Sequence, residues 1–222
     1  ERGRYAAPGE DQLALFLNAR RRTGVDGAQP GTGTRAPGLW QLHDTFILAQ
    51  TGTGLAVIDQ HSAHERILYE ALLAAFELES PAAQELVFPR TYTLGPSEWL
   101  AWEENAGLLA RLGFRLEPFG DRTLALHAVP DLGPRFHPED SFPQLLQDLA
   151  NGAVPGASQH HRIASALACR GAIKAGQPLA PEEMDRLCSD LFATDLPAAD
   201  VHGRPAIIQI RLEDLARRFD RG

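Results

Sequence analysis

The run from Asp59 to Glu70 begins with two carboxylates and an imidazole, Asp59, His61 and Glu65, in a span of seven residues at a strand-to-helix junction. The preceding residues 55–58 are apolar and partly β-branched, which predicts a strand, and apolar side chains recur at helical spacing afterwards, which predicts a helix from about residue 62. Asp59 and His61 would project to the same side of an extended chain, and Glu65 would follow one turn after His61. The sequence therefore predicts three potential metal ligands at the mouth of one helix.

The same residues also have a simpler interpretation. An aspartate before a helix is an ordinary N-cap, and a glutamate in the first turn is favoured by the helix dipole. Spacing alone does not decide between a capped, solvated helix start and a metal site, so the other motifs of the chain must be considered.

The string Asp-Gln-His-Ser-Ala-His-Glu, followed by Glu70, resembles the Asp-Gln-His-Ala-x2-Glu-x4-Glu motif of the endonuclease-type MutL proteins of DNA mismatch repair, with Ser62 in place of the family's alanine. Two later segments extend the resemblance in the order that the family requires: Ala-Cys-Arg at 168–170 and His-Gly-Arg-Pro at 202–205. Residues 41–50 are also similar to the first strand of the MutL C-terminal domain. The resemblance covers about residues 38–219.

Strands and helices without regular alternation predict an α+β fold. Residues 1–37, rich in Gly, Pro, Ala, Arg and Thr, are expected to be a flexible linker. The resemblance implies a two-lobed architecture, in which residues 38–84 and 162–222 form a dimerisation and metal-site lobe and residues 85–161 form an inserted regulatory lobe. Because the chain shows neither an initiator methionine nor a Gly-rich nucleotide-binding loop, we expect a fragment of a longer protein. The resemblance implies that an ATPase lies in an N-terminal region that this chain does not contain. The pattern predicts strands at 41–50, 54–59, 114–117, 123–129 and 205–210, and helices at 62–77, 97–112, 141–151, 158–175, 181–192 and 212–219.

The resemblance implies a set of metal ligands around two ions, Zn2+ and/or Mn2+. The implied ligands are Asp59, His61, Glu65, Cys169, Asp200 and His202, and the first three are also the expected catalytic residues. Arg170, Lys174 and Arg204 would contact DNA phosphates or lie beside the metals, and Gln60 and Glu70 would support the ligands. Without the resemblance, Cys169 is more simply a small core thiol, His202 a turn histidine, and Arg170 with Lys174 a solvated basic face.

Asp200 departs from the family pattern. The family has Cys-Pro-His-Gly-Arg-Pro where this chain has Asp-Val-His-Gly-Arg-Pro, so a carboxylate replaces a thiolate. Asp200 and His202 lie two residues apart and can face the same side of an extended chain. Such a site would favour harder ions such as Mn2+. The same departure is also an argument for a degraded, non-catalytic site.

Residues 84–89, Gln-Glu-Leu-Val-Phe-Pro, form a second candidate functional motif. They resemble the Gln-x-aliphatic-x-x-Pro motif that binds the DNA sliding clamp, so Gln84, Leu86, Val87 and Pro89 are candidate clamp-binding residues. The alternative is a strand entry after a Pro-bounded loop, with Leu86 and Phe88 in the core. Burial of the segment would favour that alternative, and exposure would favour docking.

The net charge of −8 argues against a freestanding, high-affinity DNA binder, because lysine and arginine supply most non-specific affinity for DNA. Duplex DNA is therefore expected to bind weakly to this chain alone. The resemblance implies partners that bring it to DNA: a second copy in a homodimer, the sliding clamp and a MutS-type mismatch-recognition protein.

The chain has no apolar run near the roughly 18 residues of a membrane span, no signal-peptide core and only two cysteines, which predicts a cytoplasmic protein without membrane contact.

Three functions follow from these observations. The leading hypothesis is a MutL C-terminal domain that dimerises, docks the clamp and nicks duplex DNA with bound metal. The second is a MutL domain that only dimerises and docks partners, its metal site being structural or lost. The third is a soluble metal-binding module without nuclease activity.

Overall fold

The computed structural model describes residues 38–78, 81–151 and 158–220. The linker predicted for residues 1–37 lies outside this part of the chain. The fold is α+β, as the sequence predicts, and divides into two compact units. Among the described residues, the first unit comprises 38–67 and 173–220, and the second comprises those between Leu68 and Ala172. Across the described stretches, no helix combines the length and apolar character that crossing a bilayer requires.

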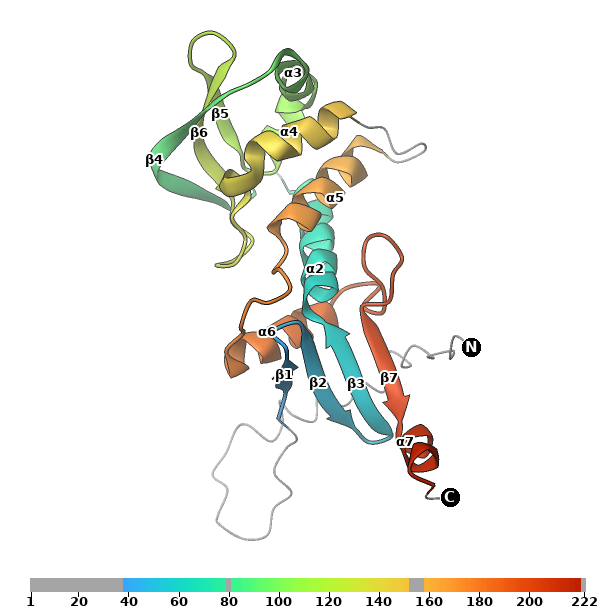
Figure 1. Cartoon of the computed structure of the whole chain (residues 1–222). Helices are drawn as coiled ribbons and strands as arrows, with labels where there is room; N and C mark the ends of the chain where they lie inside the picture. The colour runs from blue at the N-terminus through green and yellow to red at the C-terminus, as the bar shows by residue number, and fades with distance from the viewer. Residues whose placement is uncertain (1–37, 79–80, 152–157, 221–222) are drawn as a thin grey trace. The chain divides into compact units, whose positions relative to one another are not determined.

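The first unit is built on an antiparallel sheet in the order β1-β2-β3-β7 (Figure 1). One face of this sheet packs against helix α6 (Pro181–Leu191) and buries alternate residues of the central strands, among them Ile47 and Ile58. Successive side chains of a strand point to opposite faces, so this face of the sheet buries every second residue. The strands are β1 (Trp40–Leu42), β2 (Phe46–Thr51), β3 (Gly54–Asp59) and β7 (Ile207–Arg211), and the short helix α7 (Leu212–Arg218) follows β7.

The single strand predicted for residues 41–50 is wrong, because a hairpin turn divides it into β1 and β2. His43 and Asp44 both adopt left-handed backbone angles, with φ of 50° and 48°. The N–H of Thr45 closes the turn by donating to the carbonyl of Leu42 at 3.1 Å. Successive left-handed residues match the twist of a hairpin, and aspartate tolerates this conformation better than most residues.

The second unit pairs a smaller antiparallel sheet, in the order β4-β6-β5, with helices. Helix α2 (Gln60–Ala75) begins in the first unit and ends in the second. The core of the second unit contains large buried side chains such as Phe76 and Phe142. Its other elements are β4 (Ala83–Thr93), α3 (Pro96–Arg111), β5 (Arg115–Pro118), β6 (Thr123–Pro130), the 3-10 turn η1 (Pro138–Ser141), α4 (Phe142–Asn151) and α5 (Gln159–Gly171).

Helix α5 ends at Gly171, four residues before the predicted end at residue 175. Ala172 turns the chain into an extended conformation, with φ of −66° and ψ of 147°. A Cβ on Gly171 would collide with the ring of Phe136, so the close approach of this ring requires glycine. Lys174 consequently lies in a loop, and the predicted extension of this helix to residue 175 is wrong.

Strand β4 contains a wide bulge at the predicted clamp-binding segment. Glu85 pairs with Ala128 and Arg90 with Leu126, so four residues of β4 face one residue of β6. The bulge exposes 89% of Val87 and 81% of Phe88. Gln84 and Pro89 are exposed as well, whereas Leu86 packs partly against the core. The alternative of a strand with Leu86 and Phe88 in the core is therefore right for the strand and in part for Leu86, and wrong for Phe88.

Candidate metal centre

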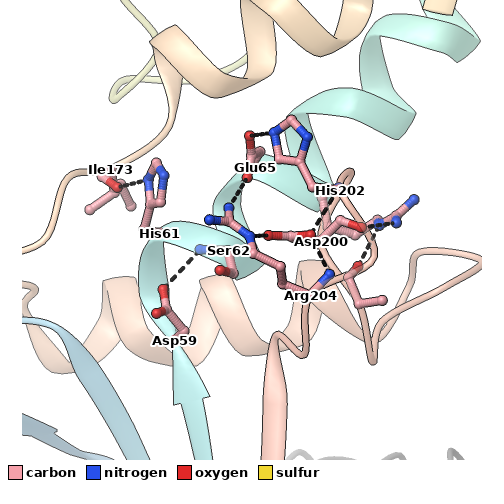
Figure 2. Close-up of polar contacts among 10 residues, drawn as sticks. Asp59, His61, Ser62, Glu65, Ile173, Asp200, His202 and Arg204 are labelled. Atoms are coloured by element: carbon pink, nitrogen blue, oxygen red, sulfur yellow. Dashed lines mark hydrogen bonds and ion pairs between the residues drawn. The ribbon is translucent and has the colours of Figure 1, made fainter.

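Asp59 is the last residue of β3 and caps helix α2. Its Oδ1 accepts a hydrogen bond from the N–H of Ser62 at 2.9 Å, and its side chain is half-buried (Figure 2). This contact satisfies one of the unpaired N–H groups at the helix start. Capping is thus part of what Asp59 does, and its role as a metal ligand stays a prediction.

His61 is turned towards Ile173, whose carbonyl oxygen lies 2.9 Å from its Nδ1 (Figure 2). Because a carbonyl can only accept, Nδ1 must carry the proton in this contact. The lone pair of the neutral ring then lies on Nε2. Histidines that bind metals usually donate their other ring N–H to a carbonyl or carboxylate in this way, so His61 is held in the tautomer that a metal ligand needs.

Glu65 is the most deeply buried acid among the predicted ligands on α2, with only 1% of its surface exposed. Its Oε1 lies 3.4 Å from Nε2 of His202, and its Oε2 lies 3.6 Å from the Arg204 guanidinium. An ionised carboxylate in this position needs positive charge nearby, because burial removes its hydration. The structure therefore brings Glu65, His202 and Arg204 together within the first unit (Figure 2).

Asp200 is fully buried and organises the turn that carries His202. Its Oδ1 accepts the N–H groups of His202 at 2.9 Å and Arg204 at 2.8 Å, and its Oδ2 accepts Nε of Arg204 at 2.5 Å. Burial opposes ionisation of the carboxyl, but these hydrogen bonds and the guanidinium charge outweigh it and lower the pKa of Asp200 below its ordinary value. Both oxygens are thus engaged by the turn, which leaves the predicted metal-ligand role of Asp200 as a prediction.

Two residues that the sequence analysis missed hold this region together. Arg66 is buried and donates from Nε to the carbonyl of Ala199 at 2.7 Å and from its terminal nitrogen to the carbonyl of Asp200 at 2.6 Å. His64 is also buried, and its Nδ1 accepts the N–H of Ile173 at 3.0 Å. Neither residue stands out in the sequence, because an Arg or His in the first turns of a helix is normally solvated.

Gln60 is completely buried, and both polar atoms of its side chain form hydrogen bonds. Its side-chain nitrogen donates to the carbonyls of Asp44, Lys174 and Gln177 at 2.7 to 3.1 Å, and its oxygen accepts from Gln41 at 2.7 Å. With two hydrogens and three acceptors, at least one of these donor contacts is shared. Gln60 therefore fastens the β1–β2 turn and the loop after α5 to the start of α2.

Glu70, the last residue of the motif, lies on the part of α2 that belongs to the second unit, where its side chain is half-buried. It follows Glu65 by five residues. The contacts of the first unit do not test whether Glu70 supports the metal ligands, so that role stays a prediction.

The predicted phosphate-contacting residues have different surroundings. Nε and a terminal nitrogen of Arg170 lie 2.7 Å and 2.6 Å from Oδ2 of Asp148 within the second unit. Lys174 has an exposed side chain, while its backbone N–H donates to the side chain of Gln177. The guanidinium of Arg204 faces the two buried acids described above. Lys174 and Arg204 are exposed, whereas Arg170 is half-buried.

Cys169 lies on α5 in the second unit, with a half-buried side chain. It forms no disulfide with Cys188, which is buried in the core of the first unit. In the described part of the chain, Asp59, His61 and Asp200 do not belong to any group of three ligand atoms lying within 4.8 Å of one another. Their assembly around ions is therefore an expectation from the resemblance.

The donor set of the first unit nevertheless fits a divalent ion. It offers a buried carboxylate on Glu65, a facing imidazole on His202, and an imidazole on His61 whose tautomer leaves Nε2 available. Carboxylate and imidazole are ligands that both zinc and manganese accept in proteins. A cation there would also offset the cost of burying the Glu65 charge.

Comparison with known proteins agrees with the motifs. The family described as the MutL C terminal dimerisation domain matches residues 39–179. Proteins named DNA mismatch repair protein MutL from Gemmatimonas aurantiaca, Symbiobacterium thermophilum and Chlorobaculum tepidum are 43%, 40% and 38% identical to this chain over 97%, 87% and 88% of its length. The chain spans 35%, 32% and 32% of these relatives, about a third of each. The chain therefore belongs to the family of MutL C-terminal dimerisation domains.

Proposed function

We propose that this domain is a metal-dependent endonuclease that nicks duplex DNA during mismatch repair. The observation that carries the proposal is the buried carboxylate of Glu65 facing Nε2 of His202, one helical turn from a histidine with a fixed tautomer. A buried acid beside an imidazole is more readily explained by a cation site than by folding alone, because an ion pair of this kind adds little net stability. Membership of the family supports the same site.

Glu65, His61, His202 and Asp59 would hold the ions, and Cys169, by resemblance, would add a thiolate. Bound ions would supply Lewis-acid stabilisation of the phosphodiester oxygens and activation of water near neutral pH. The chain's own contribution is to fix the ligands: Ile173 orients His61, and the Asp200 turn presents His202. Arg204 carries a positive charge at the edge of the same cluster, where a phosphate would approach.

The test uses the substitution Asp59→Asn. Asparagine can still accept the N–H of Ser62, so the helix cap is kept while the anionic ligand is lost. We expect the variant to fold and to lose plasmid nicking in the presence of Mn2+ or Zn2+. Nicking at the wild-type rate by this variant would move catalysis away from the proposed site.

We further propose that the domain pairs with a second copy through the outer face of the first unit's sheet. Pairing across the strands aligns Trp40 with Leu48, Leu48 with Val57, and Val57 with Ile208, which forms one apolar row. The side chain of Trp40 is largely exposed and the other three are only half-buried. A contiguous apolar sheet face of this kind is typical of a protein interface, and its self-complementarity suits a symmetric dimer.

The exposed bulge of β4 is the proposed site for the sliding clamp. Val87 and Phe88 protrude from it next to the exposed Gln84 and Pro89, which are the motif positions expected to enter a clamp groove. Docking at the clamp, together with contact to a MutS-type protein, would bring this acidic domain to DNA despite its charge.

A catalytically silent docking domain is the second candidate. The observation that favours it is the engagement of both Asp200 oxygens by His202 and Arg204, because the family's thiolate has been replaced by a group that the turn already uses. Metal titration followed by nicking assays separates the two candidates: a silent domain binds metal weakly or not at all and leaves plasmid intact, whereas it still dimerises.

A further inference from the structure

Two histidines at the start of α2 form hydrogen bonds with the backbone of one residue, Ile173. The carbonyl of Ile173 accepts from Nδ1 of His61 at 2.9 Å, and the N–H of Ile173 donates to Nδ1 of His64 at 3.0 Å. All three residues belong to the first unit. The two histidines are therefore coupled through the backbone of a residue that is distant in sequence.

The chemistry of these contacts fixes both rings. A carbonyl only accepts, so His61 must be protonated on Nδ1, and a backbone N–H only donates, so Nδ1 of His64 must be unprotonated. The two histidines thus carry opposite tautomers, although they lie on the same helix three residues apart. Only the tautomer of His61 leaves Nε2 open to a ligand.

We propose that His64 is a positioning residue for His61, acting through Ile173. His64 is 9% exposed, and it anchors the N–H of Ile173 so that the carbonyl of the same residue points at His61. The neighbouring loop is held by Gln60, which donates to the carbonyls of Lys174 and Gln177 but makes no hydrogen bond to Ile173. His64 therefore supplies the contact that sets the orientation of Ile173 itself.

The contacts among His64, Ile173 and His61 do not depend on the proposed metal site. Only their effect on metal binding rests on the proposed function. Without His64, the N–H of Ile173 loses its buried acceptor and turns towards water, and the carbonyl moves with it. His61 would then exchange between tautomers and present Nε2 to a metal for part of the time. Groups that orient a metal-binding histidine typically change metal affinity by about 10–100-fold when they are lost.

The experiment compares His64→Leu with His64→Asn. Leucine fills the buried space but cannot accept a hydrogen bond, whereas the side-chain oxygen of asparagine lies near the position of the histidine Nδ1. Nitrogen chemical shifts of the imidazoles in the metal-free protein report the tautomer of His61. We expect Nδ1–H in the wild type and in His64→Asn, and a mixture of tautomers in His64→Leu. Zn2+ titration should show a loss of roughly tenfold in affinity for His64→Leu alone.

The outcomes separate this inference from the proposed function. If the wild type binds no metal but the tautomer of His61 still depends on His64, the inference stands and the metal site fails. If His61 keeps its Nδ1–H in His64→Leu, His64 does not position it. Should His64→Leu fail to fold, the wild type alone decides: a protonated Nδ1 on His64, or an unprotonated Nδ1 on His61, overturns the proposal.

Discussion

Oε1 of Glu65 and Nε2 of His202 lie 3.4 Å apart, one on the second turn of α2 and the other on the turn before β7. The carboxylate is buried, while the turn that carries the imidazole reaches the surface. The pair therefore combines a buried carboxylate with an imidazole that is exposed to solvent.

The substitution Glu65→Gln should weaken metal binding without changing the fold. Glutamine has the same shape but no charge, so the attraction for a divalent ion falls while packing is kept. We expect Zn2+ affinity, measured by competition with a chromogenic chelator, to drop by roughly tenfold or more. The matched control is Glu104→Gln on the exposed side of α3, which removes the same charge far along the chain and should leave affinity unchanged.

Asp200 should contribute to stability in a pH-dependent way. Its pKa in the folded chain lies below the ordinary value of 3.8, so the folded state favours the ionised form. The stabilisation is fully present above pH 3.8 and is lost as the pH falls through the lower folded-state pKa. Asp200→Asn should cost about 1.5–3 kcal/mol at pH 7, the usual worth of a hydrogen bond to a charged group.

Urea unfolding of the metal-free proteins at pH 7 and near pH 3 measures this difference. The stability gap between wild type and Asp200→Asn should narrow at the lower pH, where the wild-type carboxyl begins to protonate. A gap that stays constant between the two pH values would mean that the Asp200 charge adds nothing to the turn.

An acidic side chain in the apolar row of the first sheet should break the homodimer. Val57→Asp places a charge at the centre of that row, where pairing with a second copy would desolvate it. Light scattering should show a dimer for the wild type and a monomer for the variant at micromolar concentration. Leu100→Asp, on an exposed position of α3, serves as the control and should remain dimeric. A monomeric wild type would contradict the interface altogether.

Clamp binding should depend on the bulge of β4. Gln84→Ala combined with Phe88→Ala removes two exposed side chains, so thermal stability should change little while affinity for the sliding clamp falls at least tenfold. Phe119→Ala, at an exposed site on the β5–β6 turn, is the control. Equal clamp affinity for the double variant and the control would assign docking to another surface.

The local pattern of the sequence predicted the elements that are rich in apolar residues. Strands β3 and β7 were anticipated because each is a short apolar and partly β-branched run, and the helix after β3 because its apolar side chains recur at helical spacing. The division of β1 from β2 was not, because the turn at His43 and Asp44 contains neither the glycine nor the proline that usually marks a left-handed turn in a sequence. The early end of α5 depends on the ring of Phe136, a contact distant in sequence.

In the candidate site, too, the sequence did not reveal contacts between residues that are distant along the chain. Motifs identified Glu65 and His202, which the structure places together. They did not identify His64 or Arg66, because the role of each is defined by backbone groups of Ile173, Ala199 and Asp200 that sequence spacing does not reveal. Asp200 was recognised as a departure from the family, but only the structure shows that its carboxylate is used by the turn itself.

The bulge in β4 has a consequence beyond docking. Strand β4 is the edge of its sheet, and a regular edge offers a row of N–H and C=O groups on which another chain can add a strand and begin to aggregate. The four-against-one register at residues 86–89 breaks that row, and Pro89 lacks the N–H that an added strand would need. The exposed bulge, which is the proposed docking site, thus also protects this edge of the sheet against unspecific strand addition.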